Sequence, residues 1–344
     1  MNYNIGLNAY ANTYSFDYVN CFEKPLSIIV NNDDEALQSF FLVYLKMIQS
    51  YNISGYDDPE FFYTVNFNRA LSYILGDKLG YEYRIEEVKP SNIHHLIKEY
   101  IDRGWPVLVP GNLYELSYSE YYQTGDWKHL FLINGYHEEK ETYSVIDNNH
   151  EPKNEIQKYS ETLFSYTLLE KLYTSAKEKL KVPSVWSINR TQDFKELNEL
   201  ELLEEIIHVF LHCKKEHPYK EIDYIHQINR EIDENTVDLE NEKESDVTKQ
   251  IDFIFIRTIK YKDTFYNELH TLLKKRNVPS EMLHEFNQIK TQLNRSWTNI
   301  MNEVLVNRYL MQKTLLDESL IYIQNKEKKM DEIIYRISQE LERR

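Results

Sequence analysis

The sequence predicts an α+β domain with an antiparallel sheet over residues 1–160, followed by an all-helical domain over residues 161–344. All eight glycines fall within the first 135 residues, and none occurs in the remaining 209. Glycine is favoured in the tight turns between strands and helices and disfavoured inside long helices, so this distribution indicates a change of architecture. A chain of 344 residues is also long enough for two domains that each bury a core.

The N-terminal part begins with helical patterns and continues with extended ones. Residues 26–51 form an amphipathic stretch that is interrupted near residues 31–34, which predicts two consecutive helices. Residues 91–103 start with a serine suited to cap a helix and stop before Gly104, which predicts a third. Three short segments rich in β-branched and aromatic residues are expected to pair in one antiparallel sheet: WPVLVP at 105–110, KHLFLINGYH at 128–137 and ETYSVIDNN at 141–149.

Beyond residue 160, apolar residues recur with helical spacing and many charged residues lie between them. This pattern covers residues 197–215, residues 249–275 and the run from Glu281 to the end, and it predicts four to six helices packed as a bundle. The acidic segment DENTVDLENEKESD, residues 233–246, has few large apolar residues. We expect it to be a loop or a disordered insert.

Charge and composition narrow the classes of partner. The net charge of -16 argues against a nucleic-acid partner, because phosphate binding requires clustered Lys and Arg. The first 160 residues carry 12 Lys and Arg against 23 Asp and Glu, a net charge of -11, so this part favours cationic ligands. No apolar run approaches the roughly 18 to 20 residues of a membrane span, so we expect a cytoplasmic protein without a membrane partner. The only two cysteines, Cys21 and Cys213, are expected to be reduced.

Cys21, His129 and Asp147 have the residue types and order of a catalytic triad. Cys21 lies just ahead of a predicted helix, whose N-terminus would stabilise a thiolate. His129 starts one predicted strand and Asp147 ends the next, so the imidazole can act as base and acid while the carboxylate orients it. If the turn between the strands spans residues 135–143, paired residue numbers sum to about 276, which places His129 opposite Asp147 on one face.

The order of these motifs resembles the papain-like cysteine-peptidase superfamily, in particular the family of butirosin biosynthesis protein H. The matching segments are Cys21, GWPVLVPGNLYELSYSEYY at 104–122, HLFLINGY at 129–136 and VIDN at 145–148, so the resemblance covers roughly residues 15–150. It implies a papain-like fold similar to that of bacteriocin-processing peptidases. It also implies an acyltransferase that makes an amide from a carrier-protein thioester in natural-product assembly, with Cys21 as nucleophile, His129 as base and acid, and Asp147 as orienting carboxylate.

The resemblance further implies an oxyanion hole and a set of partners. Papain-like enzymes usually carry a glutamine six residues before the cysteine, where this chain has Ser15, so Asn20 or Asn12 is expected to donate instead, with the Cys21 backbone N–H. No cofactor or metal is expected, and the acyl group would arrive on a phosphopantetheine-bearing acyl or peptidyl carrier protein. The other substrate would be a small amine. The tyrosines of the loop at 114–122 either line the acyl pocket or pack on the surface: Tyr114, Tyr118, Tyr121 and Tyr122.

Several alternatives stay open from the sequence. Water or a peptide in place of the amine would make the protein a thioesterase or a cysteine peptidase of the same fold. A non-catalytic scaffold would keep Cys21 as a buried thiol, His129 as a core histidine and Asp147 as a turn former. The helical domain would cap the cleft, bind the carrier or form a homodimer. Two Glu-x-x-His pairs imitate di-iron ligands but are about as frequent as chance allows: Glu205 with His208, and Glu281 with His284.

Overall fold

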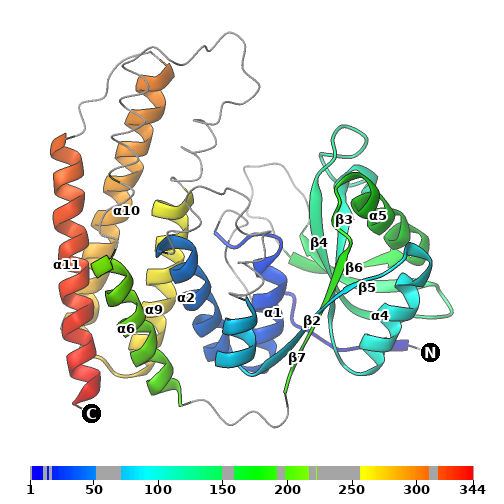
Figure 1. Cartoon of the computed structure of the whole chain (residues 1–344), viewed down its shortest axis with the longest axis horizontal. Helices are drawn as coiled ribbons and strands as arrows, with labels where there is room; N and C mark the ends of the chain where they lie inside the picture. Colours follow the sequence, from blue (N-terminus) through cyan, green and yellow to red (C-terminus); the bar gives the residue numbers. More distant parts are fainter. Residues whose placement is uncertain are drawn as a thin grey trace. The chain divides into compact units, whose positions relative to one another are not determined.

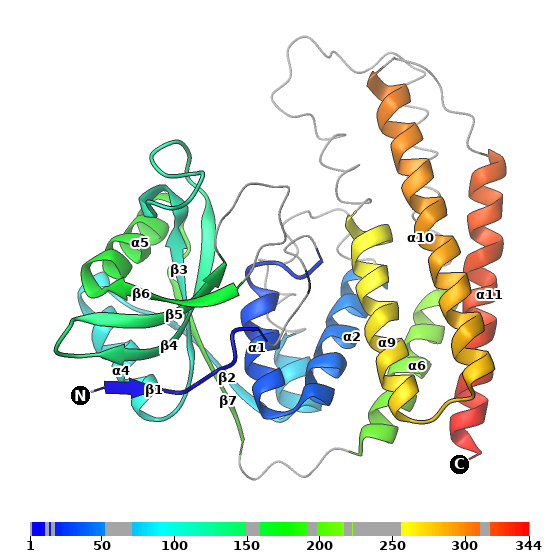
Figure 2. The same ribbon diagram turned by 180° about the vertical axis from the view of Figure 1, so that it is seen from behind.

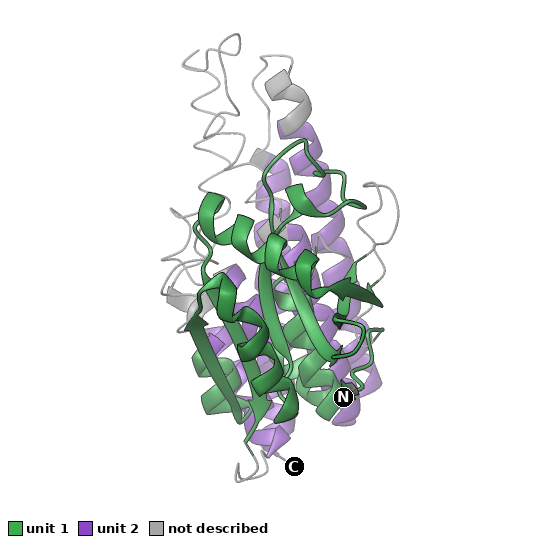
Figure 3. Ribbon diagram, turned by 90° about the vertical axis from the view of Figure 1, so that its right-hand side faces the viewer, with its two compact units in different colours: residues 1–41, 72–196 green, residues 42–71, 197–344 purple. Residues whose placement is uncertain are grey.

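The computed structural model describes residues 2–10, 14, 18–51, 71–148, 159–191, 198–216, 222, 256–309 and 317–343. The chain divides into two compact units, which Figure 3 distinguishes by colour. Unit 1 comprises residues 1–41 and 72–196, and unit 2 comprises residues 42–71 and 197–344. Unit 1 contains helices and an antiparallel sheet, so the predicted α+β class is confirmed.

The sheet of unit 1 has seven strands, and every pairing in it is antiparallel. The order is β2-β7-β3-β4-β5-β6, and β1 pairs with the C-terminal part of β4. The three predicted strands are confirmed as β3, β4 and β5. The bounds are β1 Asn2–Asn4, β2 Tyr81–Glu87, β3 Val107–Asn112, β4 Lys128–His137, β5 Thr142–Asn148, β6 Tyr159–Ser165 and β7 Ser184–Arg190.

The structure corrects the predicted domain boundary between residues 160 and 161. Strand β6 extends the sheet beyond β5, and β7 lies between β2 and β3, so unit 1 continues to Glu196. Strand β6 is the edge strand beside β5, and only its first and sixth residues are buried. Its sequence therefore lacks the alternation of apolar and polar residues that usually indicates a strand. Strand β7 pairs with strands far away in sequence, so no local hairpin signal announces it.

Two helices open unit 1 as predicted, α1 over Glu23–Asp33 and α2 over Glu35–Tyr51, and α2 continues into unit 2. The chain breaks between them at Asp34, which has extended backbone and whose Oδ1 accepts a hydrogen bond from the Ala36 N–H at 2.7 Å. Asp34 therefore separates the helices and caps the second. A π-helical turn η3, Ser72–Lys78, precedes β2.

Helix α4, Ile93–Asp102, confirms the third predicted helix, and Gly104 follows it with a φ of +80°. The predicted serine cap is wrong, because a short 3-10 turn η4, Pro90–Asn92, precedes the helix and no side chain caps it. Helix α5, Tyr166–Lys179, begins at Ser165, whose Oγ accepts from the Leu168 N–H. Helices α4 and α5 cover one face of the sheet, and α1 lies on the other side (Figures 1 and 2).

The main core of unit 1 lies between the sheet and helices α4 and α5. It contains a continuous set of buried apolar and aromatic side chains from both layers. Burial of this surface is the main force that holds the layers together. The central members are Ile97, Ile101, Val107, Val109, Phe131, Ile133, Val145, Phe164, Leu169 and Leu172.

The described residues of unit 2 contain helices and no strand, in agreement with the prediction for the region beyond residue 197. The acidic segment at 233–246 lies outside the described residues. No described helix has the length and apolar content needed to cross a membrane. Besides the end of α2, the helices are α6 Glu199–Glu216, η6 Ile256–Tyr261, α9 Lys262–Lys275, α10 Ser280–Tyr309 and α11 Asp317–Glu342.

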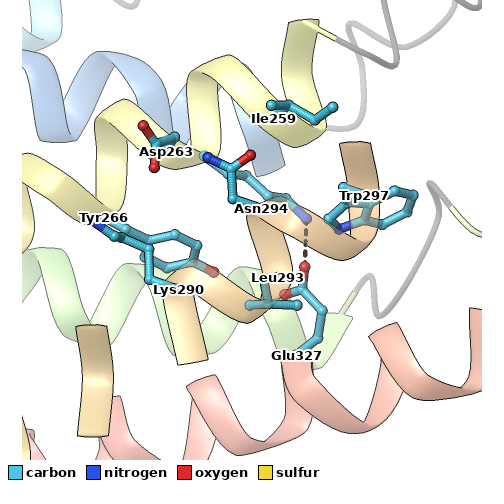
Figure 4. Close-up of a pocket in the computed structure, with 9 residues that line it drawn as sticks. Ile259, Asp263, Tyr266, Lys290, Leu293, Asn294, Trp297 and Glu327 are labelled. Atoms are coloured by element: carbon cyan, nitrogen blue, oxygen red, sulfur yellow. Dashed lines mark hydrogen bonds and ion pairs between the residues drawn. The ribbon is translucent and has the colours of Figure 1, made fainter. Parts of the chain in front are cut away.

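The interior of unit 2 contains a buried ion pair between α9 and α11. Lys262 Nζ lies 3.1 Å from Glu327 Oε1, and the two side chains are only 4% and 2% exposed. Lys262 Nζ also lies 5.8 Å from the ring centroid of Trp297, and Figure 4 labels Glu327 and Trp297, with the dashed line marking the contact of Glu327. The cavity at this point has a volume of about 10 Å³, which is enough for one water molecule.

Candidate active site

Cys21 occupies the first turn of a capped helix. Asn20 Oδ1 accepts hydrogen bonds from the N–H groups of Phe22 and Glu23, at 2.9 and 3.0 Å, and Glu23 Oε2 accepts from the Asn20 N–H at 3.1 Å. This reciprocal arrangement is a capping box. Asn20 O also accepts from Lys24 N–H, so the helical bonds begin at Asn20. Cys21 therefore lies in the turn that leads into α1, two residues before Glu23, near the positive end of the helix dipole.

His129 and Asp147 form a direct hydrogen bond inside unit 1. His129 Nε2 donates to Asp147 Oδ1 at 2.7 Å, because an ionised carboxylate can only accept. The side chains are 2% and 1% exposed, so almost no water competes for this bond. Opposite His129 in the sheet, Gly111 leaves space for the Phe131 ring, which packs edge-on against the imidazole at 4.9 Å between centroids. The imidazole is thus held on two sides.

The predicted register between the two strands is wrong by about two residues. Leu132 pairs with Ile146 and Ile133 with Val145, so paired numbers sum to 278 in this part of the ladder, and a bulge follows at Asn134. The turn is shorter than expected because β4 continues to His137 and β5 starts at Thr142. His129 and Asp147 are consequently diagonal neighbours on one face, a separation that a hydrogen-bonding side chain can bridge.

The pKa of His129 shows that Cys21 interacts with the pair formed by His129 and Asp147. Burial lowers the pKa of His129, but the charge and hydrogen bond of Asp147, together with a hydrogen bond and charge from Cys21, raise it to about 10. Because Nε2 is bound to Asp147, Nδ1 is the ring nitrogen left to meet the Cys21 sulfur. The imidazole thus stays protonated at neutral pH while it contacts the thiol. The structure brings the three predicted residues together in the order Cys21, His129, Asp147.

Tyr118 connects the tyrosine-rich loop at 114–122 to the carboxylate of Asp147. Tyr118 Oη donates to Asp147 Oδ2 at 3.1 Å, so both carboxylate oxygens are occupied. The other predicted tyrosines make different contacts: Tyr121 stacks on Trp127, Tyr122 accepts a hydrogen bond from Gln123, and Lys179 lies over the Tyr114 ring.

The buried side chain of Asn112 forms hydrogen bonds at both ends of this loop. No motif in the sequence indicated this residue. Its Oδ1 accepts from the N–H groups of Tyr114 and Trp127, at 3.2 and 3.0 Å. Its Nδ2 donates to Asp126 and Ser175. Asn112 therefore positions the segment that carries Tyr118. Asn112 lies two residues before Tyr114, the first tyrosine of the loop, and this position is the sequence feature that could have indicated it.

The two predicted oxyanion donors differ in what the structure shows. Asn12, like Ser15, lies outside the described residues. Asn20 is described, and its carbonyl oxygen is used to cap α1. Its amide nitrogen donates to no described residue, so the amide can still donate to a substrate.

Two further residues near Cys21 were missed. Lys24, one turn along α1, is only 2% exposed, and its Nζ donates to the Tyr14 carbonyl at 2.6 Å. Desolvation lowers the pKa of Lys24 to about 8. The same Nζ lies 4.7 Å from the ring centroid of Tyr159, the first residue of β6. Helical spacing places Lys24 near Cys21, but no pattern in the sequence indicates Tyr159.

No protein-family model matches the chain, and no curated protein matches it significantly. Among the described residues, no three His, Cys, Asp or Glu side chains gather in a way that could hold a metal ion.

Proposed function

We propose that the protein is a cysteine-dependent acyltransferase of papain-like fold, which forms an amide from a carrier-bound acyl thioester and an amine. The observation that carries the proposal is the buried chain of contacts from Cys21 through His129 to Asp147. An imidazole that contacts a thiol and is oriented by a carboxylate is the arrangement used by cysteine nucleophiles. The order of the sequence motifs, which resembles the butirosin biosynthesis protein H family, supports amide formation as the reaction.

The first step transfers the acyl group to the enzyme. The Cys21 thiolate attacks the thioester carbonyl, and the tetrahedral intermediate collapses with cleavage of the bond between the carbonyl carbon and the carrier sulfur. His129 gives its Nδ1 proton to the departing phosphopantetheine sulfur. The products are an S-acyl Cys21 and a free carrier thiol. The bond from His129 Nε2 to Asp147 keeps Nδ1 directed at the reacting sulfur.

The second step transfers the acyl group to the amine. The amine nitrogen attacks the S-acyl carbonyl, neutral His129 takes a proton from that nitrogen, and the Cys21 thiolate leaves. The balance is one thioester and one amine converted into one amide and one thiol. No ATP is required, because the thioester already carries the free energy of amide formation. The enzyme has to position the amine and exclude water.

The acidity of the N-terminal part supports a cationic amine as acceptor. Its net charge of -11 over residues 1–160 would raise the local concentration of a positively charged amine. We expect the Michaelis constant for the amine to increase with ionic strength, because salt screens this attraction. An amine affinity that is indifferent to salt would contradict this part of the proposal.

The direct test uses the full-length protein, an acyl pantetheine thioester and a primary diamine. Intact mass spectrometry should show one added acyl group, peptide mapping should place it on Cys21, and the diamine should convert it to an amide. The Cys21→Ala variant should show neither product. A wild-type protein that is never acylated on Cys21 would contradict the proposal. Release of the acyl group to water at the same rate with and without amine would instead identify a thioesterase or peptidase.

A further inference from the structure

Tyr159 has a buried hydroxyl without a partner in the described part of the chain. The residue is 3% exposed, and its Oη has no hydrogen bond to a described residue. Buried polar groups are almost always satisfied, because leaving one unpaired costs free energy. Such a group is a candidate for a ligand contact.

The location of Tyr159 points to the nucleophile. Tyr159 pairs with Asn148 in the β5 and β6 ladder, so it lies one position from Asp147 along the neighbouring strand. Burial raises the pKa of Tyr159 well above its usual value, and the charges of Asp147 and Cys21 raise it further. The hydroxyl therefore stays protonated, so it can donate a hydrogen bond.

Helix α1 contributes to holding the Tyr159 ring. Lys24 Nζ lies 4.7 Å from the ring centroid and is itself fixed by its bond to the Tyr14 carbonyl. A cation against an aromatic face is an attractive contact. Because Lys24 and Cys21 are one helical turn apart, the contact couples the position of Tyr159 to that of the nucleophile.

A second donor belongs to the nucleophile itself. Cys21 lies in the turn that leads into α1, and the N–H groups at the start of a helix have no partner within the helix. The Cys21 N–H donates to no described residue. We propose that this N–H and the Tyr159 hydroxyl together form the oxyanion hole, binding the carbonyl oxygen of the acyl group when Cys21 attacks it. The inference rests on the proposed function and gives Tyr159 the role for which the sequence suggested an asparagine.

The test separates attack on a carbonyl from simple reactivity of the thiol. Acylation of Cys21 by an acyl pantetheine thioester develops an oxyanion, whereas alkylation by iodoacetamide displaces iodide and develops none at the carbonyl. Both rates are measured for wild type, Tyr159→Phe and the matched control Tyr83→Phe. Tyr83 also has a buried hydroxyl without a described partner, but it lies on β2, at the opposite end of the strand order from β6.

We expect Tyr159→Phe to acylate about 100-fold more slowly than wild type, with an unchanged alkylation rate and a melting temperature that is equal or higher. Tyr83→Phe should match wild type in both rates. Acylation of Tyr159→Phe within about twofold of wild type would overturn the inference, and so would an equal loss of both rates, which indicates a structural role. A loss in Asn20→Ser, which keeps a capping oxygen, but not in Tyr159→Phe would assign the donor to Asn20 and also overturn it. A wild-type protein that alkylates but never acylates would overturn the proposed function and this inference together.

Discussion

Each of the two units contains a buried pair of oppositely charged side chains, and the surroundings of the two pairs differ. His129 and Asp147 in unit 1 lie 2.7 Å apart, and Lys262 and Glu327 in unit 2 lie 3.1 Å apart, all four side chains being at most 4% exposed. Each region also has a buried aromatic donor without a described partner, Tyr159 Oη in one and Trp297 Nε1 in the other.

The decisive difference is the third member. In unit 1, His129 also contacts the thiol of Cys21, which lies at the start of a capped helix. In unit 2, the described residues that line the cavity beside Lys262 and Glu327 include no cysteine, serine or threonine (Figure 4). Buried charge alone therefore does not mark an active site. We interpret the Lys262 and Glu327 pair as a structural contact between α9 and α11, and the His129 and Asp147 pair as part of a reactive group.

The largest expected effect is on chemistry in unit 1. Cys21→Ser should lower acylation by a thioester at least about 1,000-fold, because serine is not ionised by a neighbouring imidazolium at neutral pH. The matched control Cys213→Ser removes the other thiol and should leave the rate unchanged. Rates are measured by mass spectrometry of the acyl enzyme. Equal rates for Cys21→Ser and wild type would remove the distinction between the two regions.

The next effect is on the stability of unit 2. Glu327→Gln leaves the ammonium of Lys262 buried without its charge partner, which should lower the free energy of unfolding by about 3 to 5 kcal/mol. The double variant Lys262→Met, Glu327→Met should recover most of this loss, because it removes both charges. Urea denaturation provides the measurement. If the folded Glu327→Gln protein lost Cys21 acylation but kept its stability, the structural interpretation of this pair would be wrong.

A pH effect should appear in unit 1. The pKa of His129 is raised to about 10, so its protonated form stabilises the fold fully below the ordinary histidine pKa of about 6.5, and this contribution disappears as the pH rises to about 10. We expect the difference in unfolding free energy between wild type and His129→Gln to shrink steadily over that interval. Comparison of the two proteins cancels the other titrating groups. A difference that grows with pH would contradict the assigned charge state.

The smallest effect concerns the outer contact of the carboxylate. Tyr118→Phe removes the hydrogen bond to Asp147 Oδ2 and should cost about 1 to 2 kcal/mol of stability. The acylation rate should change less than tenfold, since His129 keeps its own bond to Asp147. Tyr122→Phe is the control, because Tyr122 lies on the same loop and its hydroxyl accepts from Gln123. A loss comparable to that of Cys21→Ser would place Tyr118 among the reacting groups.

The sequence predicted the elements that have strong local patterns. Strands β3, β4 and β5 are dense in apolar residues, and the glycine after α4 ends that helix. The contact between His129 and Asp147 was predicted from an incorrect register and is still present, because a side chain can bridge a diagonal pair as well as a direct one.

The missed features depend on contacts between residues far apart in sequence. Strand β7 pairs with β2, about 100 residues earlier, and Tyr159 lies beside Asn148 only because β6 pairs with β5. No local pattern encodes such neighbours, since they follow from the topology of the whole sheet. Strands β6 and β7 lie on either side of helix α5 in the sequence, and neither strand was predicted.

The most direct test of the central claim is the rate of Cys21 alkylation by iodoacetamide against pH, in wild type and in His129→Ala. We expect wild-type Cys21 to react rapidly near pH 6, where an ordinary thiol with a pKa of about 8.5 is almost fully protonated. In His129→Ala this reactivity should be lost and the pH profile should follow that of a small-molecule thiol. Identical profiles for the two proteins, both following the ordinary thiol, would contradict the claim that His129 activates Cys21.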